Sequence, residues 1–139
     1  MHRIVLSHFA NGIRKGQTMT KEKTKTPIVL SAGSLTKNPV KNSAGEHIGN
    51  VEELMIDYEV GRISYAVISF GGLFGINSKY FAIPWGLLKV DTEDECMILN
   101  MDRKVLENAP GFDKDNWPQV PSREWLANLY LYYEEPRYW

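Results

Sequence analysis

Residues 43–72 contain two apolar segments joined by a glycine turn, and this pattern constrains the fold more than any other part of the chain. The first segment, Glu46–Asp57, follows a turn signal at residues 43–45, and the second runs from Arg62 to Phe70. Glu59–Gly61 between them supplies the tight turn of a β-hairpin. The stretch holds no side chains arranged for a reaction. The pattern therefore favours a small β domain that holds a surface in place.

The alternation of apolar residues changes phase within the first segment. Ile48, Leu54 and Ile56 share one parity, whereas Val51 falls on the other. An extra residue in one strand of a pair produces such a slip and bends the strand. The sequence therefore predicts a β-bulge near Gly49–Glu52.

The second segment is apolar on both faces, which is unusual for a strand with one side in water. One face carries Ile63, Tyr65 and Val67, and the other carries Ala66, Ile68 and Phe70. We therefore expect the outer face to be covered by a terminal segment or by a second copy of the chain.

Four more short strands are predicted around the hairpin, so we expect a mainly β fold. They are Val40 with its neighbours, Lys79–Pro84, Leu87–Val90 and Cys96–Met101, and the acidic turn Asp91–Glu95 joins the last two. Six short strands with turns of this kind predict a small, six-stranded, strongly bent β-barrel.

Two helices are predicted after the barrel. A short one over residues 102–108 has Asp102 as its N-cap, and a final one begins at Ser122. The final helix presents one continuous apolar stripe. Its members are Trp125, Leu126, Leu129, Tyr130 and Tyr133. Eight of the chain's sixteen aromatic residues lie from Phe112 onward, and such a density is rarely left in water.

The domain organisation follows from composition. We expect residues 1–27 to be a disordered basic tail, residues 28–108 to be the barrel domain, and residues 109–139 to be an aromatic C-terminal extension with one helix. Translation could begin at Met19, which would place the first eighteen residues upstream of the protein.

Charge is unevenly spread. Residues 1–25 carry six basic and one acidic residue, a net of +5, and the rest carries ten basic and sixteen acidic residues, a net of −6. A folded part that acidic repels a phosphate backbone unless its cations are clustered, so nucleic acid is an unfavoured partner.

Compartment and membrane contact are constrained by two features. The lone Cys96 excludes an internal disulfide and suits a reducing, cytoplasmic compartment. The best candidate for a membrane span, Ile63–Ile76, is about 14 residues long, short of the roughly 20 that a bilayer helix needs. Peripheral membrane contact through the basic tail stays open.

Three segments taken in order resemble the PRC-barrel domain. They are Gly45–Asp57, Gly61–Ile68 and Phe81–Trp85, within a resemblance that covers residues 34–101. Residues 106–113 and the Tyr/Trp-rich ending look similar to extensions on bacterial stand-alone members. The family includes the cytoplasmic barrel of the photosynthetic reaction centre H subunit and the C-terminal barrel of a ribosome maturation factor.

The resemblance implies a non-enzymatic fold that docks onto larger assemblies, without choosing the assembly. The reaction-centre subunit has an N-terminal membrane helix and the ribosomal factor a separate N-terminal barrel, and residues 1–33 supply neither. No proton-path or RNA-contact residue is therefore carried over.

Candidate chemical sites are weak. Glu52 and Glu53 point to opposite faces of a strand, so with Asp57 and Glu59 they favour a solvated rim, in which Tyr58 or Arg62 pairs with Asp57 across the turn. His47 with the distant Cys96 falls short of a zinc site, and the chain has no nucleophile motif. Residues 71–75 lack the ending of a phosphate loop. We expect no catalytic, cofactor-binding or metal-binding residues, and no enzyme.

Two groups of apolar residues are the candidate interfaces. One is a glycine-rich loop whose apolar members are unexpected in a loop, and the other is the aromatic extension, which either folds back on its own barrel or crosses to a second chain. The candidates are Leu73, Phe74 and Ile76 in the loop, and Trp125, Leu129, Tyr130, Tyr133 and Trp139 in the extension.

We expect an adaptor or structural protein that mediates protein–protein interaction, with a homodimer as the favoured state. An RNA- or ribosome-associated factor that uses the basic tail is the main alternative. A component or assembly factor of a membrane electron-transport or photosynthetic complex is a weaker one, since it rests on family analogy alone.

Overall fold

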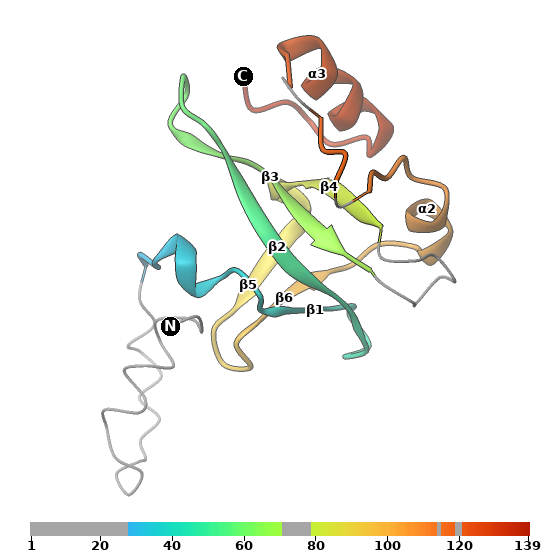
Figure 1. Ribbon diagram of the computed structural model, residues 1–139. Helices are drawn as coiled ribbons and strands as arrows, with labels where there is room; N and C mark the ends of the chain where they lie inside the picture. The colour runs from blue at the N-terminus through green and yellow to red at the C-terminus, as the bar shows by residue number, and fades with distance from the viewer. Residues whose placement is uncertain (1–27, 71–78, 114, 119–120) are drawn as a thin grey trace, which may run out of the picture.

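The computed structural model describes residues 28–70, 79–113, 115–118 and 121–139 (Figure 1). Within these residues six strands precede two α-helices, as the sequence predicts. The strands are β1 (Pro39–Lys41), β2 (His47–Asp57), β3 (Arg62–Ser69), β4 (Tyr80–Pro84), β5 (Leu88–Asp91) and β6 (Cys96–Leu99). The α-helices are α2 (Arg103–Glu107) and α3 (Arg123–Tyr132), and the short 3-10 helices are η1 (Ala32–Ser34) and η2 (Trp85–Leu87).

The strands form one mixed sheet in the order β4-β3-β2-β1-β6-β5. β1 and β6 run parallel, and the other neighbouring pairs are antiparallel. The two edge strands, β4 and β5, are consecutive in the chain and are joined by η2. The sheet therefore bends back toward itself without closing through backbone hydrogen bonds between its described edges.

Side chains fill the bent sheet and complete the barrel. The buried residues of this inner core come from all six strands, from α2, and from the residues that directly follow η1, β3 and α3. They are Leu35, Val40, Val51, Ala66, Ile68, Phe70, Phe81, Ile83, Leu88, Met97, Leu99, Leu106 and Tyr133. The predicted six-stranded, strongly bent, mainly β fold is confirmed, with the interior packing rather than a closed ladder joining its edges.

Two register shifts in the β2–β3 pair bend the hairpin. Val51 lies opposite Ile68 but Glu53 lies opposite Val67, so Glu52 is the extra residue of a bulge. This confirms the bulge that the phase slip predicts. The second shift lies on the other strand, because Met55 pairs with Tyr65 and Ile56 with Ile63, which leaves Ser64 without a cross-strand partner. The alternation of β3 gives no sign of this second bulge.

Gly49 shows how tightly β2 passes over its neighbours at the first bulge. A Cβ atom at this position would collide with the Ser69 carbonyl oxygen and would lie 2.9 Å from Cδ1 of Phe70. Only glycine leaves room for this approach, since the obstacle includes backbone that cannot rotate away.

The turn between β2 and β3 is fixed by Asp57 and Gly61. Asp57 Oδ1 accepts hydrogen bonds from the backbone N–H groups of Glu59 and Val60, at 3.1 and 3.3 Å. Gly61 adopts a φ of 83°, a conformation that glycine enters without a steric penalty. The hairpin therefore reaches beyond the rest of the sheet with a defined end, and α3 and the C-terminus lie beside it (Figure 1).

A second apolar layer covers the outer face of β3 and β4. Its buried members, which we call the outer layer, are Tyr65, Val67, Ala82, Leu126 and Tyr130. The first three come from the sheet and the last two from α3, so the cover is a terminal segment of the same chain. Of the two covers that the sequence predicts, this structure contains the terminal segment.

Both α-helices begin at the predicted caps. The side chain of Asp102 accepts a hydrogen bond from the backbone N–H of Lys104, and that of Ser122 accepts one from the N–H of Trp125. Each cap satisfies a donor that the first turn of a helix leaves free. The Ser122 cap therefore sets where α3 starts and places Arg123 at its first position.

Candidate functional site

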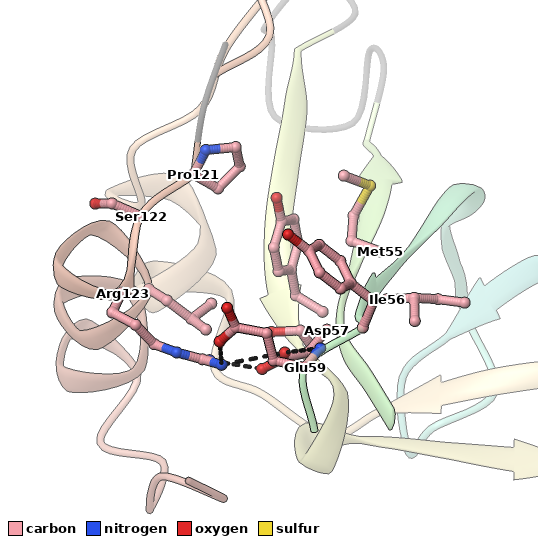
Figure 2. A pocket seen from close by; sticks show the side chains of 11 residues that line it. Met55, Ile56, Asp57, Glu59, Pro121, Ser122 and Arg123 are labelled. Atoms are coloured by element: carbon pink, nitrogen blue, oxygen red, sulfur yellow. Dashed lines mark hydrogen bonds and ion pairs between the residues drawn. The ribbon is translucent and has the colours of Figure 1, made fainter. Parts of the chain in front are cut away.

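A cleft of about 430 Å³ lies between the end of the β2–β3 hairpin and the start of α3 (Figure 2). Its hairpin wall comes from residues 55–59 with Ser64 and Tyr65, and its other wall comes from residues 121–123 with Leu126. The two walls are more than fifty residues apart in the sequence and meet only in the folded protein. We take this cleft and the hairpin end beside it as the candidate functional site.

Asp57 is the centre of the polar network in the cleft. Its carboxylate accepts hydrogen bonds from Nη1 and Nη2 of Arg123, at 2.5 and 3.1 Å, and from the Tyr138 hydroxyl at 2.6 Å. Together with the two turn amides, these donors link the hairpin, the start of α3 and the end of the chain. The Asp57 side chain is 7% exposed, so this carboxylate is used structurally and is largely removed from water.

The electrostatics of the pair follow from these contacts. The hydrogen bonds from Arg123 and Tyr138 hold the pKa of Asp57 well below its usual range. The same bonds to Asp57 raise the pKa of Arg123 above its usual value. Glu59 adds a second carboxylate 3.3 Å from Nη2 of Arg123, as the dashed lines of Figure 2 mark. Both charged partners therefore stay ionised over the whole physiological range.

The second bulge supplies the other polar anchor of the cleft wall. The Tyr130 hydroxyl donates to the Ser64 carbonyl oxygen at 2.6 Å, and the Tyr138 hydroxyl lies 2.9 Å from Ser64 Oγ. Because the bulge removes Ser64 from the ladder with β2, its polar groups are free to bind the tail. Burial raises the pKa of Tyr65 and of Tyr130 to about 12, so both phenols stay neutral at physiological pH.

Large apolar side chains stand exposed at the hairpin end. Ile56 is 60% exposed, Tyr58 88% and Val60 47%. They adjoin the cleft, which Ile56 and Tyr58 also line. Contiguous exposed apolar residues of this kind often mark contact surfaces. We call Ile56, Tyr58 and Val60 the hairpin tip.

The residues that the sequence predicts as interfaces are partly outside the described residues and partly packed within their own chain. Leu73, Phe74 and Ile76 lie outside the described residues. Tyr130 and Tyr133 are buried at 2% and 7% exposure, within the outer layer and the inner core of their own chain. Trp125, Leu129 and Trp139 are partly buried against the same layers. The extension therefore folds back on its own barrel here, and its contact with a second chain stays a prediction.

The partners of Asp57 differ from those that the sequence suggests. Arg62 instead has its guanidinium 4.3 Å from the centroid of the Tyr138 ring, and Tyr58 is exposed. The interpretation of these carboxylates as a solvated rim is therefore wrong for Asp57, although Glu59 is 68% exposed. Arg123 and Tyr138 lie 66 and 81 residues away, and neither the hairpin pattern nor the helix cap links them to Asp57.

The other predicted chemical residues have ordinary structural contacts. His47 Nε2 is 2.8 Å from the carbonyl oxygen of Gly49. Cys96 is buried, and this burial raises the pKa of its thiol. Among the residues that the structure describes, no group of three or more His, Cys, Asp or Glu side chains is placed to hold a metal ion. Over the same residues, no helix combines the length and the apolar character needed to cross a membrane.

Comparison with known families gives one match. The model of the PRC-barrel domain family matches residues 27–106, more than half of the chain. The match covers all six strands and most of α2, and it ends before α3. No curated protein matches the chain. The cleft therefore has one wall inside the matched region and one wall outside it.

Proposed function

We propose that this chain, which belongs to the PRC-barrel domain family, is a non-enzymatic protein that docks a protein partner on the hairpin tip and the adjoining cleft. Membership of the family supports a domain of the protein-interaction kind. The position of the docking surface is our inference from the geometry of the described residues.

The observation that carries the proposal is the pairing of exposed apolar side chains with a rigid support. Ile56, Tyr58 and Val60 are exposed, while the neighbouring Asp57 is held by Arg123, by Tyr138 and by two turn amides. A surface held in one conformation loses little conformational entropy when a partner binds. Tyrosine at such a position buries much area at a small entropic cost.

The use of the polar groups in the cleft supports a non-enzymatic role. Asp57, Arg123 and Ser64 bond one another or the tail, and the hydroxyl of Ser122 caps α3. A nucleophile needs a base within hydrogen-bond reach, and a general acid or base needs a pKa near the operating pH. The depressed pKa of Asp57 and the raised pKa of Arg123 move both groups away from that range. We further propose that the protein is a cytoplasmic adaptor, since its lone Cys96 suits a reducing compartment.

We also propose that the chain self-associates, but through a different surface from the aromatic extension that the sequence suggests. Because Tyr130 and Tyr133 are buried in their own chain, a homodimer would form through the hairpin tip unless two chains exchange their extensions. Light scattering on the full chain and on Tyr58→Ser separates these routes. A dimer that persists in the variant would contradict a dimer contact through the tip.

A photo-crosslinking experiment tests the docking surface. A photoreactive residue replaces Tyr58 in the full chain, and crosslinked proteins are identified by mass spectrometry after irradiation in cells of the native organism. The matched control carries the same group at Leu131, which is 74% exposed on α3. We expect a discrete crosslinked protein at position 58 that is absent at position 131, and its loss when Ile56→Asp is added. Equal crosslinking at both positions would overturn the proposal.

A further inference from the structure

Arginine side chains gather around the end of the chain. The three arginines whose side chains the structure describes, Arg62, Arg123 and Arg137, all lie over one pair of neighbouring rings. Arg62 is 4.3 Å from the centroid of Tyr138, and Arg123 and Arg137 are each 5.4 Å from that of Trp139. The two ring centroids are 4.9 Å apart. The three guanidiniums therefore belong to one small surface in the part of the chain after residue 25, which carries ten basic and sixteen acidic residues.

Arg123 shows what a guanidinium in this setting can do. It stacks on Trp139 while its two terminal nitrogens donate to the carboxylate of Asp57. Stacking uses the face of the planar group and leaves its N–H edge free, so one arginine can make both contacts. A ring below the guanidinium also limits its rotation, which reduces the entropy lost when a carboxylate binds.

Arg62 and Arg137 share the stacked arrangement without the carboxylate. Both residues are exposed. Among the described residues neither forms an ion pair with a carboxylate, and Arg62 makes only a long bond, 3.3 Å from Nε to the carbonyl oxygen of Ile63. Arg62 and Arg137 therefore lie over the aromatic rings with terminal N–H groups that bind no carboxylate among the described residues, whereas Arg123 already binds Asp57.

We propose that Arg62 and Arg137, stacked on Tyr138 and Trp139, bind the carboxylates of an acidic segment on a protein partner. This inference rests on the proposed docking function and adds the chemistry of the partner. Charge complementarity supports it. Arg123 lies over an aromatic ring and already binds the carboxylate of Asp57, whereas Arg62 and Arg137 lie over rings without a carboxylate partner among the described residues. Arg62 lies at the first position of β3, directly after the turn that carries the hairpin tip. A partner on the tip therefore reaches Arg62.

A protein carboxylate fits this surface better than a nucleic acid does. Residues 28–139 carry ten basic and sixteen acidic side chains. A nucleic acid brings a phosphate with every nucleotide across its whole footprint, so most of them would face this net negative charge. One or two carboxylates on a protein bring little charge beyond the two guanidiniums, and the apolar tip matches a protein surface rather than a phosphate backbone.

Fluorescence anisotropy with the full chain tests the site. The probe is a fluorescein-labelled peptide of alternating glutamate and leucine, at low ionic strength. We expect the double variant Arg62→Gln/Arg137→Gln to weaken binding about five- to tenfold. The matched control, Lys89→Gln/Lys104→Gln, removes the same charge from exposed positions on β5 and α2 and should bind like the native chain. Equal weakening by both variants, or no weakening by the first, would overturn the proposal.

Two further measurements keep the proposal falsifiable. Arg62→Lys/Arg137→Lys keeps the charge and removes the forked donors, so it should bind nearly as weakly as the glutamine variant. Native-like binding would show that positive charge alone holds the peptide and would overturn the proposed arginine site. Single-stranded RNA is the second probe, and we expect the glutamine variant to leave its binding unchanged. A loss confined to RNA would assign the surface to nucleic acid and overturn the proposal.

The outcomes also separate this inference from the proposed function. If a protein is crosslinked at position 58 but the arginine variants bind the acidic peptide normally, the docking function stands and the acidic partner is wrong. If position 58 gives no specific crosslink while the arginine effect is present, the hairpin docking proposal fails and the anion site stands.

Discussion

The inner core and the outer layer both pack on β3, on opposite faces of the same strand. Ala66 and Ile68 enter the inner core, whereas Tyr65 and Val67 enter the outer layer. The inner core consists of apolar side chains from every strand. The outer layer joins β3 to a helix more than fifty residues later in the chain, and the hydroxyls of Tyr130 and of the adjoining Tyr138 contact Ser64.

This difference teaches how the two faces are specified. Non-directional burial fills the inner core, and strand alternation decides which residues take part. The outer layer depends in addition on directional bonds, which place α3 and the last residues at one position on the sheet. The hairpin tip and the arginine surface both depend on that position, because Arg123 and Tyr138 come from the covering segment.

The largest effect is expected in the inner core. Ile68 is 0% exposed, so Ile68→Ala should lower the free energy of unfolding by about 2–5 kcal/mol through lost burial and the cavity left behind. Urea denaturation measures the change, and the exposed Ile56→Ala is the control, with an expected change below about 0.5 kcal/mol. Similar losses in both variants would contradict the placement of Ile68 in the inner core and of Ile56 at the exposed hairpin tip.

A smaller and more local effect is expected in the outer layer. Leu126 is 7% exposed on α3, and Leu126→Ala should cost about 2 kcal/mol, the low end of the range, because only one side of the layer faces the sheet. Hydrogen exchange should show faster opening of residues 123–132 than of β2 and β3, since the helix can detach from the barrel. Equal acceleration in α3 and in the strands would mean that the two layers form one cooperative unit.

The sequence predicts the strands, the covered face of β3 and the helix starts well because these signals are local. The phase slip at Gly49–Glu52 gives the first bulge, the two-faced third strand requires a cover, and Asp102 and Ser122 mark both helix starts. Each of these features is contained in a few consecutive residues. The family match over residues 27–106 agrees with the barrel that these signals predict.

The site is less predictable because its contacts join distant segments. Ser64 leaves the β2–β3 ladder at a bulge that the alternation of β3 does not reveal. The choice of Arg123 over Arg62 as the partner of Asp57 depends on where the C-terminal segment lies. The exposure of Ile56, Tyr58 and Val60 follows from the length by which the hairpin extends beyond the sheet, which residue type alone does not give.

Tyr130 tests the directional part of the outer layer. Tyr130→Phe keeps the ring in place and removes the hydroxyl that donates to the Ser64 carbonyl oxygen. We expect a loss of about 1 kcal/mol in the free energy of unfolding, because a buried acceptor loses its donor. The control is Tyr58→Phe on an exposed ring, with no expected change. An unchanged stability in Tyr130→Phe would show that burial alone positions the helix.

Asp57→Asn is tested by how its effect changes with pH, because the amide keeps an oxygen that can accept the turn and arginine bonds but loses the charge. The pKa of Asp57 is held below its usual range in the folded protein, so its charge stabilises the fold fully above about pH 4, the ordinary value for an aspartate. That stabilisation is lost as the pH falls toward the depressed folded value. The difference in melting temperature between the native chain and Asp57→Asn should therefore be constant from neutral pH down to about pH 5 and shrink below about pH 4.

Calorimetry over a pH series measures this difference, and Glu53→Asn, at an exposed position on β2, serves as the control for general charge effects. A difference that grows on acidification would contradict the depressed pKa. The same pH series is repeated with the native Asp57 and with Asp57→Asn in the Arg123→Gln and Tyr138→Phe backgrounds. If the pH dependence of the difference in melting temperature disappears in Arg123→Gln and persists in Tyr138→Phe, the guanidinium is the main cause of the lowered pKa of Asp57. The reverse result would make the end of the chain, rather than the start of α3, the stronger link between the outer layer and the hairpin.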